Sequence, residues 1–271
     1  MVFEKEIEKY EFIREEKTSY TPIFDKDEQS VLIALVKKVF NKNFTNEKSV
    51  RIDLIDDIEN KIHISISDFY SFLISNFLSI NKDKLINKAD EYEKKLICRF
   101  ISQVNEDDIR CFEDIYKVGY LSNIVAISCV ITDKKGKVLI TTRNNNVGIG
   151  NGFLSVSVTG SVDESDFMRS DPFVACCKRE VKEELGFEID DISKILVKKI
   201  VCGSLKLQPI VLIDVIVEDI QDVVEAVKKC DGFNEENSKY YICEREEVRV
   251  LIESKKYNLT EAGLTHLESL L

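Results

Sequence analysis

Hydrophobic and polar residues in the first part of the chain are ordered in a way that predicts helices around one β-hairpin. A dense group of apolar residues indicates a buried helix at 29–43. Apolar and polar residues alternate at 50–54 and again at 62–66, and this period of two predicts paired strands with a turn between them. Further helices are predicted at 68–79 and 107–118. Between them, a helical face with spacings of three and four consists of Leu85, Ala89, Tyr92, Leu96 and Phe100.

The second part of the chain shows strand-like patterns on both sides of a helix. Strands are predicted at 123–132 and 137–143, and after a glycine-rich loop an alternating segment turns at Gly160. The remaining predicted elements are strands at 195–202, 209–217 and 240–243 and helices at 172–185, 220–229, 246–253 and 260–271. We therefore expect an α/β (α+β) fold in which a mixed sheet is sandwiched between helices.

The distribution of glycine predicts a domain boundary near residue 118. All ten glycines lie at or after Gly119. Glycine is needed where the backbone turns with positive φ or approaches a ligand closely, so a segment without it should consist mainly of regular elements. We expect residues 1–118 to form a mostly helical domain containing the hairpin, and residues 119–271 to form a second domain. The first could supply a partner surface or a homodimer interface, although its apolar residues suit an ordinary core equally well.

Composition and charge narrow the classes of function. The chain has 271 residues, of which 44% are hydrophobic and 32% charged, and its formal net charge is −11, as expected of a soluble globular protein. This acidity and the lack of a basic stripe argue against a nucleic-acid partner. Neither a signal peptide nor an apolar stretch of roughly 20 residues is present, so we expect a cytoplasmic protein without a membrane contact. The eight cysteines lack C-x-x-C spacing and lie in apolar runs, which predicts reduced core residues.

The predicted helix at 172–185 groups three carboxylates. Asp171 is a favourable N-cap, and Gly186 can end the helix in a left-handed cap. Helical spacing places Glu180, Glu183 and Glu184 on one stripe. Clustered carboxylates repel one another and need cations nearby, and oxygen ligands suit hard divalent ions such as Mg²⁺ or Mn²⁺. The alternative is an acidic helix face exposed to solvent.

A motif favours the metal-binding interpretation. The run REVKEELGF at 179–187 is similar to the R-E-U-x-E-E-x-G-U half of the Nudix box, where U is an apolar residue. Upstream, Gly160 stands for the glycine of the box and Asp171 replaces its first glutamate. The loop between them is four or five residues longer than in the family pattern, and it carries the insertion DESDFMRS. The resemblance covers about 123–271 and implies a Nudix-like fold.

The resemblance also implies an activity, namely metal-dependent hydrolysis of a pyrophosphate bond in a nucleoside diphosphate-linked small molecule. It implies that Glu180, Glu183 and Glu184, with the carbonyl of Gly160, bind Mg²⁺ or Mn²⁺. Catalytic roles are expected for Glu183, Glu184 and Arg179, and the sequence does not separate the base from the ligands. The substrate stays open among nucleotide sugars, dinucleotides and nucleoside triphosphates.

Two further site assignments depend on position alone. Arg143 ends a predicted strand, where a guanidinium can bind a substrate phosphate, or it is a surface residue paired with a carboxylate. Glu235 or Glu236 could supply a distal acid. Because the loop departs from the family pattern, a non-catalytic nucleotide-binding regulatory module is the alternative to an enzyme.

Overall fold

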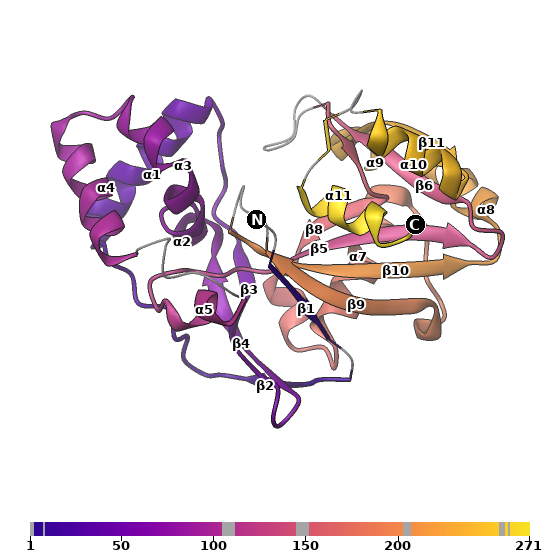
Figure 1. Cartoon of the computed structure of the whole chain (residues 1–271), viewed down its shortest axis with the longest axis horizontal. Helices are drawn as coiled ribbons and strands as arrows, with labels where there is room; N and C mark the ends of the chain where they lie inside the picture. Colours follow the sequence, from indigo (N-terminus) through magenta and orange to yellow (C-terminus); the bar gives the residue numbers. More distant parts are fainter. Residues whose placement is uncertain are drawn as a thin grey trace.

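The computed structural model contains two β-sheets with helices packed around them (Figure 1). It describes residues 3–7, 9–104, 112–144, 152–202, 207–254, 258–259 and 261–271. The smaller sheet and most N-terminal helices lie on one side of Figure 1, and the larger sheet lies on the other. No helix in these ranges is long and apolar enough to cross a membrane.

The N-terminal half surrounds a three-stranded sheet with the order β2-β4-β3. Its strands and helices are β2 (Glu11–Arg14), α1 (Lys26–Phe40), β3 (Lys48–Asp56), β4 (Lys61–Asp68), α2 (Phe69–Leu73), α3 (Asn76–Ile86), α4 (Glu91–Gln103) and α5 (Phe112–Lys117). The predicted hairpin is confirmed as β3 and β4, which pair antiparallel. The predicted helix at 68–79 is in fact interrupted between α2 and α3. A capping box at Asp90 starts α4 separately, so the apolar face from Leu85 to Phe100 belongs to two helices.

The C-terminal half is built on a sheet with the order β1-β9-β10-β5-β6-β11, onto which β7 and β8 add beside β6 and β5. Its strands are β1 (Phe3–Glu6), β5 (Ala126–Asp133), β6 (Val138–Arg143), β7 (Leu154–Ser155), β8 (Val158–Ser161), β9 (Ile195–Cys202), β10 (Pro209–Val217) and β11 (Asn237–Cys243). The pairing of β10 with β5 is parallel, whereas β5 pairs antiparallel with β6. The expected mixed sheet is therefore confirmed.

Helices cover both faces of this sheet. They are α6 (Glu164–Phe167), α7 (Pro172–Leu185), α8 (Ile220–Val227), α9 (Phe233–Glu236), α10 (Arg245–Glu253) and α11 (Glu261–Glu268). Alternate residues of β5 separate two apolar cores, because Cys129 belongs to the core that contains α7 and α8 whereas Val130 belongs to the core under α10 and α11. The expected helix–sheet–helix arrangement is thus present.

Residues before and after the predicted boundary at residue 118 are in contact at two places. Strand β1 pairs antiparallel with β9, so the first strand belongs to the sheet of the C-terminal half (Figure 1). In addition, the amide of Val50 in β3 donates to the carbonyl of Val162, and the amide of Val125 donates to the carbonyl of Val50. The two sheets are therefore joined by backbone hydrogen bonds, and the division into two domains remains a prediction.

The cysteines in the described residues are free thiols, and most of them are buried as predicted. Cys129 and Cys177 lie in the core with their sulfur atoms 3.7 Å apart. The prediction is wrong for Cys98, which is exposed on α4, and Cys111 lies outside the described residues.

A buried histidine joins α11 to the sheet. The ring of His266 forms hydrogen bonds with the hydroxyl of Ser128 at 3.0 Å and with Oδ1 of Asp214 at 2.9 Å. Burial lowers the pKa of His266 below its usual value of 6.5, although the charge of Asp214 opposes this shift. The imidazole is therefore neutral in the folded protein near pH 7.

This burial predicts a loss of stability in acid. Below about pH 6.5 the unfolded chain binds a proton at His266 that the folded chain does not, so stability falls as the pH falls. We expect the free energy of unfolding, measured in urea, to decrease less between pH 7.5 and pH 5.5 in His266→Gln than in the wild type. Equal decreases in the two proteins would contradict the prediction.

Candidate active site

Helix α7 brings the predicted carboxylates to one region because its ends are well defined. The side chain of Asp171 accepts hydrogen bonds from the amides of Phe173 and Val174, and Gly186 ends the helix with φ of 66°. Between these caps, Cys177, Val181 and Leu185 are buried against the sheet. The predicted helix at 172–185 is confirmed to the residue, and its adjacent stripe carries Glu180, Glu183 and Glu184.

Arg179 connects this stripe to the loop that precedes the helix. Its Nη1 donates to Glu180 at 2.8 Å and to Glu183 at 3.1 Å. Its Nη2 donates to the carbonyl of Ser161 at 2.9 Å and to Oδ2 of Asp166 at 2.9 Å. Burial alone would lower the pKa of Arg179. The hydrogen bond with Asp166 and the charges of the nearby carboxylates outweigh this effect and raise the pKa of Arg179 above its already high value. The guanidinium is therefore a permanent cation held between two groups of carboxylates.

Gly160 lies directly against the carboxylate of Glu180. A Cβ atom at this position would fall 2.0 Å from Cδ of Glu180 and 2.1 Å from its Oε1. Only glycine leaves room for that side chain, so β8 and α7 together fix the place of Glu180. The predicted neighbours Gly160, Arg179 and Glu180 are thus brought together.

Replacing Gly160 by alanine should displace Glu180 rather than unfold the protein. The clashing atoms are at the end of a flexible side chain, which can swing away at a small structural cost. We expect kcat/KM to fall about 10- to 100-fold, as for other changes that misplace a metal ligand. The free energy of unfolding should stay within about 1 kcal/mol of the wild type. Gly119→Ala is the control, since its Cβ would lie at an ordinary contact distance of 3.7 Å from the nearest atom; equal activities would refute the prediction.

Glu184 points in a different direction from Glu183. Only 5% of Glu184 is exposed, and its Oε2 accepts a hydrogen bond from Nδ2 of Asn237 at 2.9 Å. The side chain of Glu183, by contrast, is 60% exposed. Asn237 starts β11 and lies opposite Arg143 in the ladder with β6. The end of β6 and the buried carboxylate of α7 therefore meet at Asn237.

Arg143 also contacts the strand that carries Gly160. Its Nη1 donates to the hydroxyl of Thr159 at 2.6 Å. Arg143, the arginine predicted to bind the substrate, therefore contacts the residue that directly precedes Gly160. The glycine-rich loop that follows it lies outside the described residues from 145 to 151.

The structure shows the contacts of three other acids near the site, Asp171, Asp166 and Asp163. Asp171, which replaces the first glutamate of the box, caps α7 and is partly buried, and this desolvation raises its pKa. The carboxylates bonded to Arg179 from outside the helix are instead Asp166 and, at 3.4 Å, Asp163. Both lie in the insertion, where no periodic pattern marks them. Burial alone would raise the pKa of Asp163. The hydrogen bond with Ser165 and the positive charge of Arg179 outweigh this effect, so the pKa of Asp163 is lowered.

The distal acid remains a prediction. Glu235 is exposed on α9, a helix that packs against α7. The side chain of Glu236 lies outside the described part of the chain. Asn237, the next residue, is the one that contacts the site, and the sequence analysis did not single it out because a lone asparagine at a strand start carries no motif.

The donor set suits a hard divalent cation by its chemistry. It offers carboxylate oxygens, and Gly160 leaves room beside Glu180 that any side chain would fill. Within the described ranges, however, no three or more His, Cys, Asp or Glu side chains are gathered in an arrangement that could hold a metal. The reason lies in the partners described above, because Arg179 draws Glu180 and Glu183 toward itself while Asn237 holds Glu184. A cation would therefore have to compete with Arg179 for the carboxylate oxygens of Glu180 and Glu183.

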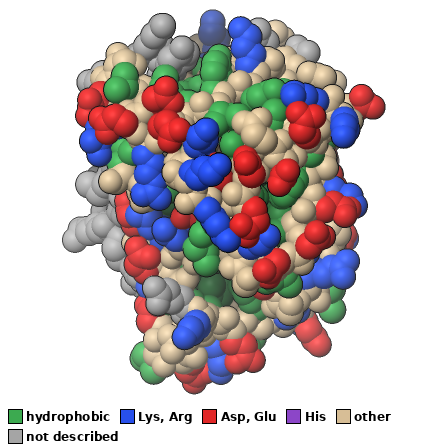
Figure 2. All heavy atoms as spheres, turned by 90° about the vertical axis from the view of Figure 1, so that its right-hand side faces the viewer, with side chains coloured by type: hydrophobic (Ala, Val, Ile, Leu, Met, Phe, Trp, Pro, Cys, Tyr) green, Lys and Arg blue, Asp and Glu red, His purple; other side chains and the backbone are tan. Residues whose placement is uncertain are grey.

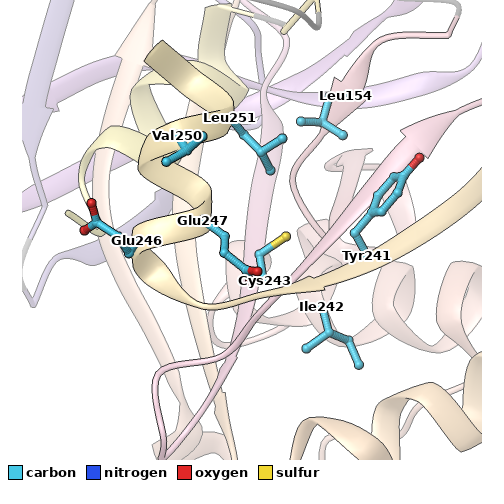
Figure 3. Close-up of a pocket in the computed structure, with 8 residues that line it drawn as sticks. All are labelled: Leu154, Tyr241, Ile242, Cys243, Glu246, Glu247, Val250 and Leu251. Carbon is cyan, nitrogen blue, oxygen red and sulfur yellow. The ribbon is translucent and has the colours of Figure 1, made fainter. Parts of the chain in front are cut away.

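A pocket elsewhere in the structure is apolar and distant from this chemistry. It has a volume of about 460 Å³ and lies between β11 and α10, where it is lined by Leu154, Tyr241, Ile242, Cys243, Val250 and Leu251, with two glutamates of α10 (Figure 3). Its buried lining belongs to the core under α10 and α11, on the opposite face of the sheet from α7.

On the side of the molecule seen in Figure 2, acidic and basic side chains are interspersed.

Comparison with protein-family models agrees with the motif. The model of the NUDIX domain matches residues 122–229, which include β5, β8 and α7. Among solved structures, the NUDIX hydrolase from Alicyclobacillus acidocaldarius is similar with a TM-score of 0.43 and 12% identity, covering 54% of this chain and 90% of that one. The MutT protein from Methanosarcina mazei Go1 is similar with a TM-score of 0.36 and 18% identity, covering 54% and 91%. DR0079 from Deinococcus radiodurans has a TM-score of 0.40 and 14% identity, covering 54% and 82%.

A search of curated proteins finds no significant match. The domain match spans the strand that carries Gly160 and the helix that carries the three glutamates. Residues 122–229 of this chain therefore match the NUDIX domain, in agreement with the motif at 179–187.

Proposed function

We propose that this protein hydrolyses a pyrophosphate bond in a nucleoside diphosphate-linked small molecule with the help of Mg²⁺ or Mn²⁺. The observation that carries the proposal is the placement of Glu180 against Gly160 and beside Arg179, on a helix that also presents Glu183 and Glu184. The match of residues 122–229 to the NUDIX domain supports pyrophosphate hydrolysis in general. The substrate within that class and the metal requirement are part of the proposal.

The charges of the site explain why these residues suit the reaction. A pyrophosphate carries several negative charges that repel an incoming water oxygen, so its hydrolysis needs positive charge in place. Glu180, Glu183 and Glu184, with the Gly160 carbonyl, would hold the divalent ion. That ion would neutralise the pyrophosphate and lower the pKa of the attacking water.

The protein's own groups would orient the reactants. Arg143, at the end of β6, can donate two hydrogen bonds to a phosphate, and Thr159 fixes one of its nitrogens. Glu183 is the exposed carboxylate of the three and can accept a proton from water, whereas the buried Glu184 is held by Asn237. Arg179 would hold Glu180 and Glu183 in register, as partners of metal ligands commonly do.

A product assay over a panel of compounds tests the proposal. The panel contains nucleotide sugars, dinucleotides and nucleoside triphosphates, each incubated with Mg²⁺, with Mn²⁺ and with EDTA. We expect release of a nucleoside monophosphate from at least one class, and we expect EDTA to abolish it. Binding of nucleotides without any product from the whole panel would contradict the proposal and favour the non-catalytic regulatory module.

A further inference from the structure

The insertion before α7 is held by the N-terminal half of the chain. The amide of Val50 in β3 donates to the carbonyl of Val162 at 2.7 Å, and Ser49 and Asp163 form an adjacent backbone bridge. Arg14 in β2 donates from Nε to the carbonyl of Phe167 at 2.7 Å and from Nη2 to the carbonyl of Arg169. The segment 162–169 is thus fastened to β2 and β3, which lie on the far side of the predicted domain boundary.

The insertion delivers one buried carboxylate. Asp166 lies in α6, only 3% of it is exposed, and the capping interactions between Asp163 and Asp166 define the turn. Its Oδ2 accepts a hydrogen bond from Nη2 of Arg179 at 2.9 Å and another from the amide of Asp163 at 3.2 Å. Because Asp166 is buried and only 22% of the Arg179 side chain is exposed, water screens this pair less than it screens a surface ion pair.

Arg179 then divides its two terminal nitrogens between the insertion and the glutamates. Nη2 faces Asp166 and the carbonyl of Ser161, whereas Nη1 faces Glu180 and Glu183. Since the guanidinium is planar and rigid, fixing one nitrogen fixes the direction of the other. The negative charge of Asp166 also offsets the positive charge of Arg179. A divalent cation would therefore meet less repulsion and weaker competition for the glutamate oxygens.

We propose that Asp166 is a positioning residue for the hydrolytic site and that the N-terminal half, through Arg14, keeps it in place. In this arrangement Asp166 contacts Arg179, whereas the side chain of Asp171 caps α7. The residues before 118 then contribute to the metal site without touching it. This inference rests on the proposed function for its catalytic readout, but not for its metal-binding readout.

Two substitutions at position 166 and one control substitution test the first part. Asp166→Asn keeps the shape and removes the charge, Asp166→Glu keeps the charge, and Glu164→Gln on the same helix is the control because Glu164 is exposed and pairs only with Lys48 among the described interactions. We expect Asp166→Asn to lower kcat about 10-fold with KM changed less than twofold, and to weaken Mn²⁺ binding, measured by electron paramagnetic resonance without substrate, about 10-fold. Asp166→Glu should recover most of both losses, and Glu164→Gln should match the wild type.

The contribution of Arg14 is tested by a double-mutant cycle. If Arg14 acts by holding Asp166, Arg14→Ala should weaken Mn²⁺ binding, and Arg14→Ala combined with Asp166→Asn should be no worse than Asp166→Asn alone. Additive losses would overturn the link through the N-terminal half. Urea unfolding of each variant separates these effects from a general loss of folding.

The outcomes distinguish this inference from the proposed function. Unchanged Mn²⁺ binding and unchanged kcat in a folded Asp166→Asn protein would overturn the positioning role while leaving the hydrolase intact. Weakened Mn²⁺ binding in this variant, together with a wild type that releases no product from any compound, would uphold the positioning role and overturn the proposed function.

Discussion

Replacing Glu184 by glutamine is expected to lower kcat/KM about 1,000-fold while leaving the fold unchanged. The substitution removes one negative charge and preserves volume, and the new amide oxygen can still accept the hydrogen bond from Asn237. In the proposed mechanism Glu184 is a metal ligand, and loss of such a ligand removes electrostatic stabilisation of the transition state worth several kcal/mol, where each 1.4 kcal/mol corresponds to a factor of ten. The measurement is steady-state kinetics at saturating Mg²⁺ with whichever compound of the panel is hydrolysed.

The stability of this variant separates a chemical effect from a structural one. A buried carboxylate is desolvated, so its removal should leave the free energy of unfolding equal or higher. Glu188→Gln is the matched control, because Glu188 is exposed and pairs with Lys182 at the surface. Wild-type kcat in Glu184→Gln would exclude Glu184 from the metal site.

Arg51→Met is expected to lower the free energy of unfolding by about 3–5 kcal/mol, the usual effect of leaving one partner of a buried ion pair alone. Arg51 is fully buried in β3 and forms an ion pair with Asp53. It also donates to the carbonyl of Ser122 at 2.9 Å and to the hydroxyl of Ser19 at 2.8 Å. Burial lowers its pKa, although the charge of Asp53 opposes this. Methionine fills the space but removes the donor to the carbonyl of Ser122 and the positive charge beside Asp53, whose Oδ1 then keeps the hydrogen bonds from the amide and hydroxyl of Ser19.

Urea unfolding of Arg51→Met checks the prediction against Lys94→Met, which removes a surface pair with Glu91 and should change stability by less than about 0.5 kcal/mol. Adding Asp53→Asn to Arg51→Met should restore part of the loss, since the buried charge is then gone. A loss below about 1 kcal/mol in the single variant would mean that water or rearranged neighbours replace the guanidinium.

Local patterns in the sequence were sufficient for most of the fold. The caps of α7 at Asp171 and Gly186, and the alternation in β3 and β4, are properties of neighbouring residues and were predicted correctly. Strand β1 was missed because the residues FEKE at Phe3–Glu6 hold a single apolar side chain and become a strand only by pairing with β9, almost 200 residues later. Helix α6 was missed because its four residues carry no period.

Some residues of the candidate site were likewise predictable from local patterns, and others were not. Glu180, Glu183 and Glu184 share a helix, so the period of 3.6 residues and the motif place them together. Asn237 is 53 residues from Glu184, and its amide meets that carboxylate only because β11 pairs with β6. Asp166 reaches Arg179 only because the insertion folds back over the helix. Contacts of this kind depend on tertiary structure, and no local spacing indicates them.

The pairing of β1 with β9 limits where this chain can be cut into fragments without exposing the edge of the larger sheet. A fragment starting near residue 119 would keep the whole Nudix box but would lose the outermost strand, and β9 would then present unpaired amides and carbonyls to solvent. Bare strand edges recruit other strands, so such a fragment should be prone to self-association. The C-terminal half therefore needs β1, from the start of the chain, to complete the edge of its own sheet.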